Sequence, residues 1–274
     1  MKKIEIVLTQ SLIKDDLELK DKNIIVIDIL RSSTTIAVAL SNGAKEIVPA
    51  ENVSTAAKIA RGTGKSLLCG EREGKIVEGF DLGNSPLEYK REVIDNKSLV
   101  FSTTNGTSSI VKAKHAKSCA IASFVNLSDI TKHIESQKED FIIICSGKLG
   151  NFCLEDAVCA GVIINQVIHS GAKKKKQILG DSEIASIELG RIYALENDKP
   201  SSKKIMKMFK KTEHGKYLMS LGLEKDLAVC SEINSYPCLP LYMDGVIKLK
   251  DKIEIESIEK SKMKKIDISN KDNQ

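Results

Sequence analysis

Residues 28–35 place an acid, a base and four hydroxyl side chains directly after an apolar run. The run ending at Asp28 is typical of a buried parallel strand, and Ser32 is predicted to begin a helix. Free N–H groups and the dipole at such a helix start favour a bound anion. Arg31 can bind phosphate oxygens through two hydrogen bonds, with Ser33 beside it, and Asp28 can bind a hard cation or attack phosphorus. The alternative interpretation is a helix cap next to a surface arginine.

Two further loops carry charged or amide side chains. Arg72 lies within residues 70–74, which follow a predicted strand, and places a second arginine at a strand's carboxyl end. Residues 79–86, Gly-Phe-Asp-Leu-Gly-Asn-Ser-Pro, hold too many small and turn-forming residues for a core element. They predict a structured loop that presents Asp81 and Asn84. An ordinary turn is the alternative interpretation of each loop.

Residues 102–107, Ser-Thr-Thr-Asn-Gly-Thr, occupy a position later in the chain equivalent to that of the Asp28 loop. Hydroxyl groups and an amide replace the acid and the base there. Asn105, Gly106 and Thr107 can therefore donate hydrogen bonds to an anion but cannot neutralise its charge. Helix capping alone is the alternative.

The remaining candidates lie in the more helical second half of the chain. Ser146 and Gly147 follow a predicted strand, and Glu155 and Asp156 lie near the start of the next predicted helix. These two carboxylates either suit the helix dipole alone or reach a metal ion. His214 can protonate a leaving alkoxide, although a solvated helix histidine is an equal alternative.

Three common phosphate-binding signatures are absent. The glycine-containing residues 62–66 lead from a helix into a strand, the reverse of a P-loop, and Ile59 stands where that loop needs glycine. A cysteine phosphatase would need arginine at the position of Asn151, six residues after Cys145. A site of the haloacid dehalogenase type would need a second acid at the position of Leu30. The predicted site is therefore of another kind.

An internal repeat positions these loops and indicates an α/β fold. Two successive βαβαβ units are predicted, and residue 102 of the second corresponds to residue 28 of the first. Such units form parallel or mixed sheets covered by helices, with right-handed crossovers. We expect two similar lobes with the site between them, beyond the carboxyl ends of the strands. The predicted strands lie at residues 24–28, 44–49 and 66–69, and again at 99–102, 118–122 and 141–145.

The repeat also sets the expected domain boundaries. We expect one catalytic unit over residues 1–249, with lobe one at about 1–97 and lobe two at about 98–249. Asp244-Gly245 between two short apolar runs predicts a hairpin. Residues 250–274 are charged and repetitive and predict a loosely ordered tail.

Composition excludes several classes of protein. The 274 residues are 42% hydrophobic and 29% charged, which is typical of a globular protein. Aromatic residues make up only 4%, so surfaces for stacking nucleic-acid bases are scarce and no nucleic-acid partner is expected. No apolar run approaches the ~20 residues of a membrane helix, and no signal-peptide core precedes the first strand. We therefore expect a cytoplasmic protein with no membrane partner, whose seven cysteines are thiols.

Taken together, the motifs resemble the 2-phosphosulfolactate phosphatase family over about residues 3–249. The string around Asp81 is the most specific of them, and Glu213 stands where the family often has arginine. The resembling strings are Ile27-Asp28-Ile29-Leu30-Arg31-Ser32-Ser33-Thr34-Thr35, Asn42-Gly43-Ala44, Gly70-Glu71-Arg72, Gly79-Phe80-Asp81-Leu82-Gly83-Asn84-Ser85-Pro86, Thr103-Thr104-Asn105-Gly106-Thr107, Leu154-Glu155-Asp156, Cys159-Ala160-Gly161 and His214-Gly215.

The resemblance implies a Mg²⁺-dependent phosphatase that converts (2R)-phospho-3-sulfolactate to (2R)-3-sulfolactate and phosphate, a step of coenzyme M synthesis in some organisms. The candidate metal ligands are Asp28, Asp81, Glu155 and Asp156, and the candidate catalytic residues are Asp28, Arg31, Asp81 and His214. The candidate substrate-binding residues are Arg31, Ser32, Ser33, Arg72, Asn84, Asn105, Gly106, Thr107, Ser146 and Gly147.

Two alternatives stay open at this point. The first alternative to phosphosulfolactate hydrolysis is a phosphatase for another small anionic phosphoester. The second is a non-catalytic protein that binds a small anion. Anion binding needs arginines and helix starts but no cluster of acids, so the acids favour the enzyme. A homo-oligomer is compatible with either alternative.

Overall fold

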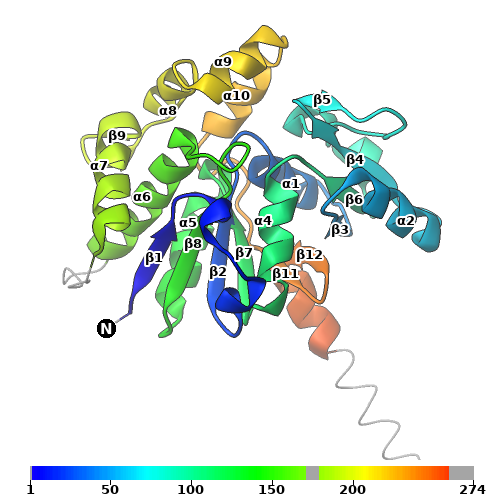
Figure 1. Cartoon of the computed structure of the whole chain (residues 1–274), viewed down its shortest axis with the longest axis horizontal. Helices are drawn as coiled ribbons and strands as arrows, with labels where there is room; N and C mark the ends of the chain where they lie inside the picture. The colour runs from blue at the N-terminus through cyan, green and yellow to red at the C-terminus, as the bar shows by residue number, and fades with distance from the viewer. Residues whose placement is uncertain (1, 171–178, 259–274) are drawn as a thin grey trace, which may run out of the picture.

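The computed structural model of the chain describes residues 2–170 and 179–258. In this part of the chain ten strands form one sheet with helices packed on both faces, and two more strands form a small separate hairpin (Figure 1). The strands of the large sheet are β1 (Ile4–Val7), β2 (Asn23–Ile27), β3 (Glu46–Pro49), β4 (Leu67–Arg72), β5 (Lys75–Ile76), β6 (Ser98–Ser102), β7 (Ser118–Ala122), β8 (Phe141–Cys145), β11 (Pro240–Met243) and β12 (Val246–Leu249). The small hairpin pairs β9 (Leu195–Glu196) with β10 (Lys199–Pro200).

The helices follow the strands as a parallel sheet requires, because a crossover between parallel strands needs a connecting element. Within the described residues, none of them is long and apolar enough to cross a membrane. The helices are α1 (Ser32–Ser41), α2 (Val53–Thr63), α3 (Arg91–Ile94), α4 (Gly106–Lys112), α5 (Leu127–Ser136), α6 (Leu154–His169), α7 (Asp181–Tyr193), α8 (Ser202–Phe209), α9 (Glu213–Ser220) and α10 (Glu224–Ser231).

The sheet confirms the α/β class and is mostly parallel, with the strand order β1-β8-β2-β7-β11-β12-β3-β6-β4-β5. The two repeated units do not form consecutive lobes, however. In one half, β2 of the first unit lies between β7 and β8 of the second, and in the other half β6 of the second unit lies between β3 and β4 of the first. Each half of the sheet therefore draws strands from both sides of residue 97. The physical reason is that the first strand of each unit is buried along almost its whole length, and a strand buried in this way is best placed with a parallel neighbour on both edges.

The hairpin formed by β11 and β12 joins the two halves. It pairs antiparallel with β7 on one side and with β3 on the other. Asp244 and Gly245 have φ values of 51° and 83°, as a two-residue turn with positive φ at both central positions requires. The hairpin predicted around these two residues is confirmed.

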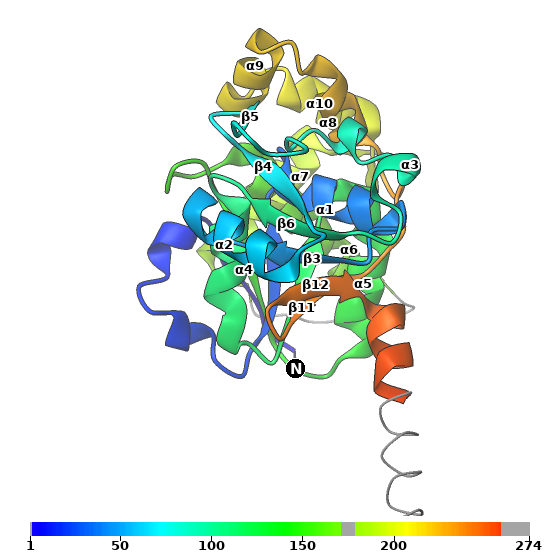
Figure 2. The same cartoon turned by 90° about the vertical axis from the view of Figure 1, so that its right-hand side faces the viewer.

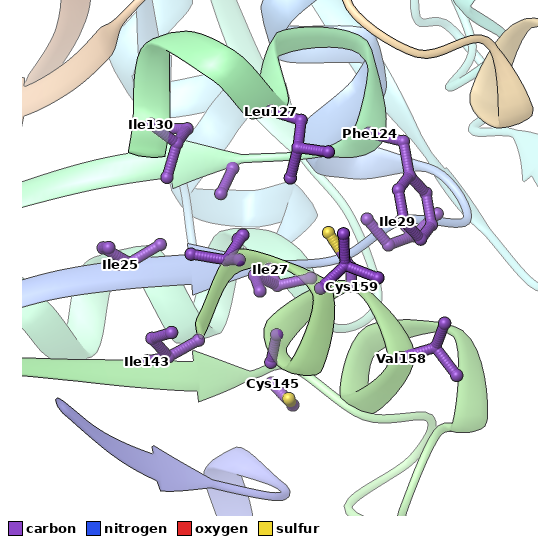
Figure 3. Close-up of a cluster of buried hydrophobic side chains, with 14 of the residues drawn as sticks. Ile25, Ile27, Ile29, Phe124, Leu127, Ile130, Ile143, Cys145, Val158 and Cys159 are labelled. Atoms are coloured by element: carbon purple, nitrogen blue, oxygen red, sulfur yellow. The ribbon is translucent and has the colours of Figure 1, made fainter. Parts of the chain in front are cut away.

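The core has two layers because β2 is apolar on both faces. Ile25 and Ile27 belong to one cluster and Ile24 and Val26 to the other, so successive side chains enter opposite layers. Figure 3 shows the first layer, in which Ile25 and Ile27 lie among side chains of β8, α5 and α6. All four side chains are fully buried, which fixes β2 in the sheet and so fixes the loop that follows it.

Helices α8, α9 and α10 gather at the end of the molecule opposite the N-terminus (Figure 1). Figure 2 shows β5 on the same side as α9. The Tyr217 hydroxyl of α9 donates a hydrogen bond to the Glu73 carbonyl in the turn between β4 and β5, at 2.9 Å. These three helices therefore form a cap over the loops at the carboxyl ends of the strands.

Residues 250–258 form a helix, which differs from the expected loose tail. Ile253 packs against the core, and the Lys252 ammonium donates to the Ala44 carbonyl at 3.2 Å. An ion pair between Lys250 and Glu254, one helical turn apart, supports the same helix. Figure 2 shows this helix beside the hairpin of β11 and β12, at the end opposite α9. The other residues of the predicted tail, 259–274, lie outside the described residues.

The hairpin between the two halves of the sheet can be tested by mutation. Ile247 is fully buried and pairs with Ile47 of β3, so Ile247→Ala should lower the free energy of unfolding by about 2–5 kcal/mol. Met243→Ala in the same hairpin is the matched control. Because Met243 is 41% exposed, this variant should lower the free energy of unfolding far less. Chemical denaturation of both variants measures the difference, and equal losses would show that Ile247 is not packed against β3 where the two halves of the sheet join.

Candidate active site

A cavity of about 310 Å³ lies between the carboxyl ends of the strands and the cap. Its walls come from the loops after β2, β6 and β8, the end and following turn of β4, the loop containing Asn84, and α9. This is the edge at which the sequence predicts the site, and ligands of open α/β sheets bind at such edges. The lining residues are Asp28, Leu30, Arg31, Ser32, Glu71, Glu73, Gly74, Asn84, Thr104, Asn105, Lys148, Leu149, His214 and Tyr217.

The equivalent loops of the two repeated units meet at this cavity. The Ser32 hydroxyl donates to the Thr103 hydroxyl at 3.0 Å, which links the start of α1 to the loop before α4. A Cβ atom on Gly106 would lie 2.6 Å from Asp28 Oδ2, so only glycine allows this approach. The repeat therefore brings the starts of two helices together beside one carboxylate.

Asp28 is the most strongly perturbed acid in the cavity wall. Its side chain is buried, and the hydrogen bond that it accepts from the Ser32 N–H is long, at 3.4 Å. Burial, followed by the nearby charge of Glu71 and the weaker effect of Glu155, raises the pKa of Asp28 to about 7. This carboxyl group can therefore give or take a proton near neutral pH.

Arg31 is held rigidly by a buried ion pair. Its Nη1 lies 2.5 Å from Asp226 Oδ2, and its Nη2 donates to the Gly74 carbonyl at 2.9 Å. The other Asp226 oxygen accepts a hydrogen bond from the Ser85 hydroxyl at 2.7 Å. The side chains of Arg31 and Asp226 are only 3% and 2% exposed. Arg31 lines the cavity as predicted, but α10 fixes its orientation.

Glu71 lines the cavity, and sequence reasoning missed it. One of its oxygens accepts from the Gly74 N–H at 2.7 Å and the other from the Thr104 N–H at 2.8 Å. Arg72, the residue selected from the sequence, instead donates to the carbonyl and hydroxyl oxygens of Ser102, at 3.2 and 2.9 Å, and does not line the cavity. Successive side chains of a strand point to opposite faces, so only one of the pair can face the cavity.

The loop at residues 79–86 presents one of its two candidates. Asn84 lines the cavity, is buried, and its Oδ1 atom has no hydrogen-bond partner. Asp81 is exposed, does not line the cavity, and accepts a hydrogen bond from the Leu68 N–H at 2.8 Å. The Asp81 side chain thus holds its own loop against β4, since short acidic side chains commonly accept hydrogen bonds from nearby backbone N–H groups in turns.

Glu155 and Asp156 begin α6 but face different surroundings. The Asp156 oxygens accept from the N–H groups of Ile29 and Gly147, at 2.9 and 3.1 Å, so this acid holds together the loops after β2 and β8. Burial, then the charge of Asp28, raises the pKa of Asp156 well above its usual range. Glu155 lines an adjoining cavity of about 380 Å³, and its Oε1 atom has no hydrogen-bond partner.

His214 and Lys148 line both cavities. Burial, aided by the charges of Lys148 and Arg31, lowers the pKa of His214 to about 4, so the imidazole is neutral at pH 7. Lys148 forms an ion pair with Glu213 at 2.8 Å, and its ammonium lies 5.4 Å from the centre of the Tyr217 ring. Sequence reasoning did not select Lys148 or Tyr217 for the site, since neither belongs to a recognisable motif.

The small polar candidates divide into two groups. Ser32 and Asn105 line the cavity, and Asn105 Oδ1 also accepts from the Leu149 N–H at 3.0 Å. The others do not line it. Among these, the Ser33 hydroxyl accepts from the Asp28 N–H at 2.8 Å and so orients the strand end. The candidates outside the lining are Ser33, Gly106, Thr107, Ser146 and Gly147.

Comparison with known proteins identifies the family. A sequence model of the family described as 2-phosphosulpholactate phosphatase matches residues 7–245. A probable 2-phosphosulfolactate phosphatase of Thermotoga petrophila is 39% identical over 83% of this chain and 92% of that protein. A protein of the same description from Clostridium tetani is 36% identical over 89% of this chain and 99% of its own length.

Fold, cavity and relatives together define an α/β enzyme of the phosphoric monoester hydrolase class. The chain belongs to the 2-phosphosulfolactate phosphatase family. The resemblance drawn from its motifs is confirmed.

The perturbed pKa of Asp28 predicts how stability depends on pH. Because the pKa is raised to about 7 in the folded protein, the stabilising contribution of Asp28 is complete below its ordinary pKa and is lost as pH rises through 7. Asp28→Asn carries no charge, so it should be more stable than the natural protein at pH 8, by on the order of a few kcal/mol. The difference should shrink toward pH 4.

Denaturant unfolding at several pH values between 4 and 8 measures this difference. Asp244→Asn, in the exposed hairpin turn, is the control and should change stability little at any pH. A constant offset for Asp28→Asn across this range would show that Asp28 has no raised pKa in the folded protein.

Proposed function

We propose that this chain is a Mg²⁺-dependent phosphatase of the cytoplasm that hydrolyses (2R)-phospho-3-sulfolactate to (2R)-3-sulfolactate and phosphate. The observation that carries the proposal is the cavity in which Asp28 and Glu71 lie with Arg31 and Lys148. Acids and bases that line one pocket suit a site that binds an anion and also a cation. Membership of the family, and the names of the relatives, support the choice of substrate.

The size of the cavity favours a small ligand. Its volume of about 310 Å³ lies at the lower end of the usual range for ligand sites, ~300–1,000 Å³. A three-carbon acid with one phosphate and one sulfonate group is compatible with that space. A nucleotide or a phosphopeptide would have to extend beyond the cavity.

The charges of the cavity support a divalent cation. Three acids line it (Asp28, Glu71 and Glu73) but only two bases (Arg31 and Lys148), and each base is already paired with an acid. The substrate would add phosphate, carboxylate and sulfonate charges to this set. Without a cation the acids would repel it, so the proposed reaction requires Mg²⁺ or a comparable ion.

Oxygen donors in the cavity fit Mg²⁺, which binds through carboxylate and carbonyl oxygens. Asp28 and Glu71 supply carboxylates, and the buried Asn84 Oδ1 atom lacks any other partner. We propose these three residues as ligands in place of the set expected from the sequence, of which only Asp28 lines the cavity. When bound, the ion would offset charge that develops on the phosphate oxygens.

The side chains then have separate roles. The ion pair with Asp226 fixes the orientation of the Arg31 guanidinium, which offers a positive charge to the phosphate. This matters because phosphoryl transfer depends mainly on positioning and on stabilisation of charge. Asp28, with a pKa of about 7, holds the proton of the attacking water or attacks phosphorus itself. His214 is a neutral imidazole and so offers one N–H donor rather than an acidic imidazolium.

Phosphate release from a panel of small esters tests the proposal. Activity should be highest with 2-phospho-3-sulfolactate, lower with 2-phospholactate, which lacks the sulfonate, and lost after EDTA treatment until Mg²⁺ is added. Asp28→Asn should lower kcat by at least about 100-fold, because a charge that acts in the transition state is removed. Borohydride trapping during turnover followed by mass spectrometry distinguishes the two roles of Asp28, since only a carboxylate nucleophile forms an acyl phosphate that the reagent reduces.

Full turnover in a demonstrably metal-free sample would remove Mg²⁺ from the mechanism. Tight binding of the whole panel without phosphate release would instead identify a non-catalytic anion-binding protein.

Lys148 is proposed to bind the sulfonate or carboxylate of the substrate. Its partner Glu213 is 89% exposed, and a surface ion pair of this kind is weak and easily exchanged for a ligand anion. Lys148→Ala should lower kcat/KM for phosphosulfolactate by about 10–100-fold, the usual cost of losing a charged hydrogen bond. Glu213→Gln should act in the opposite direction and lower KM, because it frees the ammonium group.

Steady-state kinetics of both variants with phosphosulfolactate and phospholactate measures these effects. Lys210→Ala is the control, since Lys210 forms a comparable ion pair with Glu224 but lines neither cavity. Equal losses for Lys148→Ala and Lys210→Ala would contradict the proposed role.

A further inference from the structure

Three side chains of different chemistry converge beside the catalytic cavity. Cys153 precedes α6, Glu155 lies in its first turn, and His214 lies in the first turn of α9. One donor atom from each, the thiol sulfur, a carboxylate oxygen and a ring nitrogen, lies within 4.8 Å of the other two. The proposed Mg²⁺ ligands do not include any of the three.

One oxygen of the carboxylate in this cluster lacks a hydrogen-bond partner. Glu155 is 1% exposed, and its Oε1 atom has no hydrogen-bond partner. The same atom lies 3.7 Å from His214 Nδ1, too far for a hydrogen bond. Buried polar atoms are nearly always satisfied, so an orphaned carboxylate oxygen aimed at two other donors indicates a ligand between them.

We propose that Cys153, Glu155 and His214 bind one transition-metal ion of intermediate softness, for which Zn²⁺ is the best fit. Sulfur and nitrogen donors select such ions and disfavour Mg²⁺, which prefers oxygen. A tetrahedral Zn²⁺ ion holds its donors roughly 3–4 Å apart, so small side-chain rotations bring the three atoms into place. On binding, the thiol releases its proton to solvent and coordinates as thiolate.

The surroundings leave the fourth position of such an ion open. The cluster lines the adjoining cavity of about 380 Å³, which has room for water or a small anion. Zinc sites with three protein ligands and one exchangeable position are the kind that interact with ligands, whereas purely structural sites usually have four protein ligands. His214 lines both cavities, so a bound ion would fix a side chain of the catalytic cavity.

Titration of the metal-free full-length protein with Co²⁺, a coloured substitute for Zn²⁺, tests this site directly and without substrate. One equivalent should give a near-ultraviolet thiolate-to-cobalt charge-transfer band, which Zn²⁺ abolishes and an excess of Mg²⁺ does not. Cys153→Ser should lose the band. Since loss of a residue that merely orients a ligand costs about 10–100-fold in affinity, loss of the ligand should weaken Zn²⁺ binding by at least about 100-fold.

Cys238→Ser is the matched control, because Cys238 is the one cysteine of the described residues that is not fully buried and is the obvious competitor for a metal. It should keep both the band and the affinity. Melting temperatures in metal-free buffer show whether each variant folds, and Glu155→Gln, which keeps the thiol, should also weaken Zn²⁺ binding. The proposal is overturned if the natural protein gives no thiolate band, if Cys153→Ser keeps it, or if Cys238→Ser loses it.

Discussion

Buried carboxylates are crowded at one end of the sheet, and the rest of the site is arranged around the repulsion between them. Asp28, Glu155 and Asp156 are each at most 7% exposed. A buried charge is costly unless hydrogen bonds or opposite charges compensate for it. Asp156 accepts hydrogen bonds from two backbone N–H groups and so secures two loops, whereas the backbone hydrogen bond that Asp28 accepts from Ser32 is long, at 3.4 Å. The pKa of Asp156 is raised well above its usual range and that of Asp28 to about 7, so Asp28 is the acid of the cavity wall that changes its protonation near neutral pH.

The ion pair of Arg31 and Asp226 shows how the cap completes the site. The two residues are 195 positions apart in the chain, and their contact ties α10 to the start of α1. Removing one partner of a buried pair leaves an uncompensated charge, so such pairs fix geometry even where they add little net stability. Ser85 donates to the same Asp226, which brings the loop containing Asn84 into the same network. The cap thus orients the cavity's arginine and also helps to enclose the cavity.

Sequence reasoning succeeded where the signal is local. The apolar run before Asp28 specifies a buried strand, and Asp244-Gly245 specifies a tight turn, so both elements were predictable. It failed where the outcome depends on distant partners. Glu71 and Arg72 are adjacent, and the pairing of β4 decides which of them faces the cavity. Lys148 belongs to the site only because α9 packs above it, and no pattern near Lys148 in the sequence records that contact.

Dependence on distant partners also explains why the two predicted lobes do not form, and why the loops of both repeated units line one cavity. The two repeated units exchange strands across the sheet, so their equivalent loops meet instead of forming two separate sites. Asp28 and Arg31 of the first loop correspond to Ser102 and Asn105 of the second. If the second loop also carried an acid and a base, two further charges would be buried at the same place. With Gly106 at the point of contact, the second helix start approaches Asp28 closely without adding a charge to the place where Asp28 is buried.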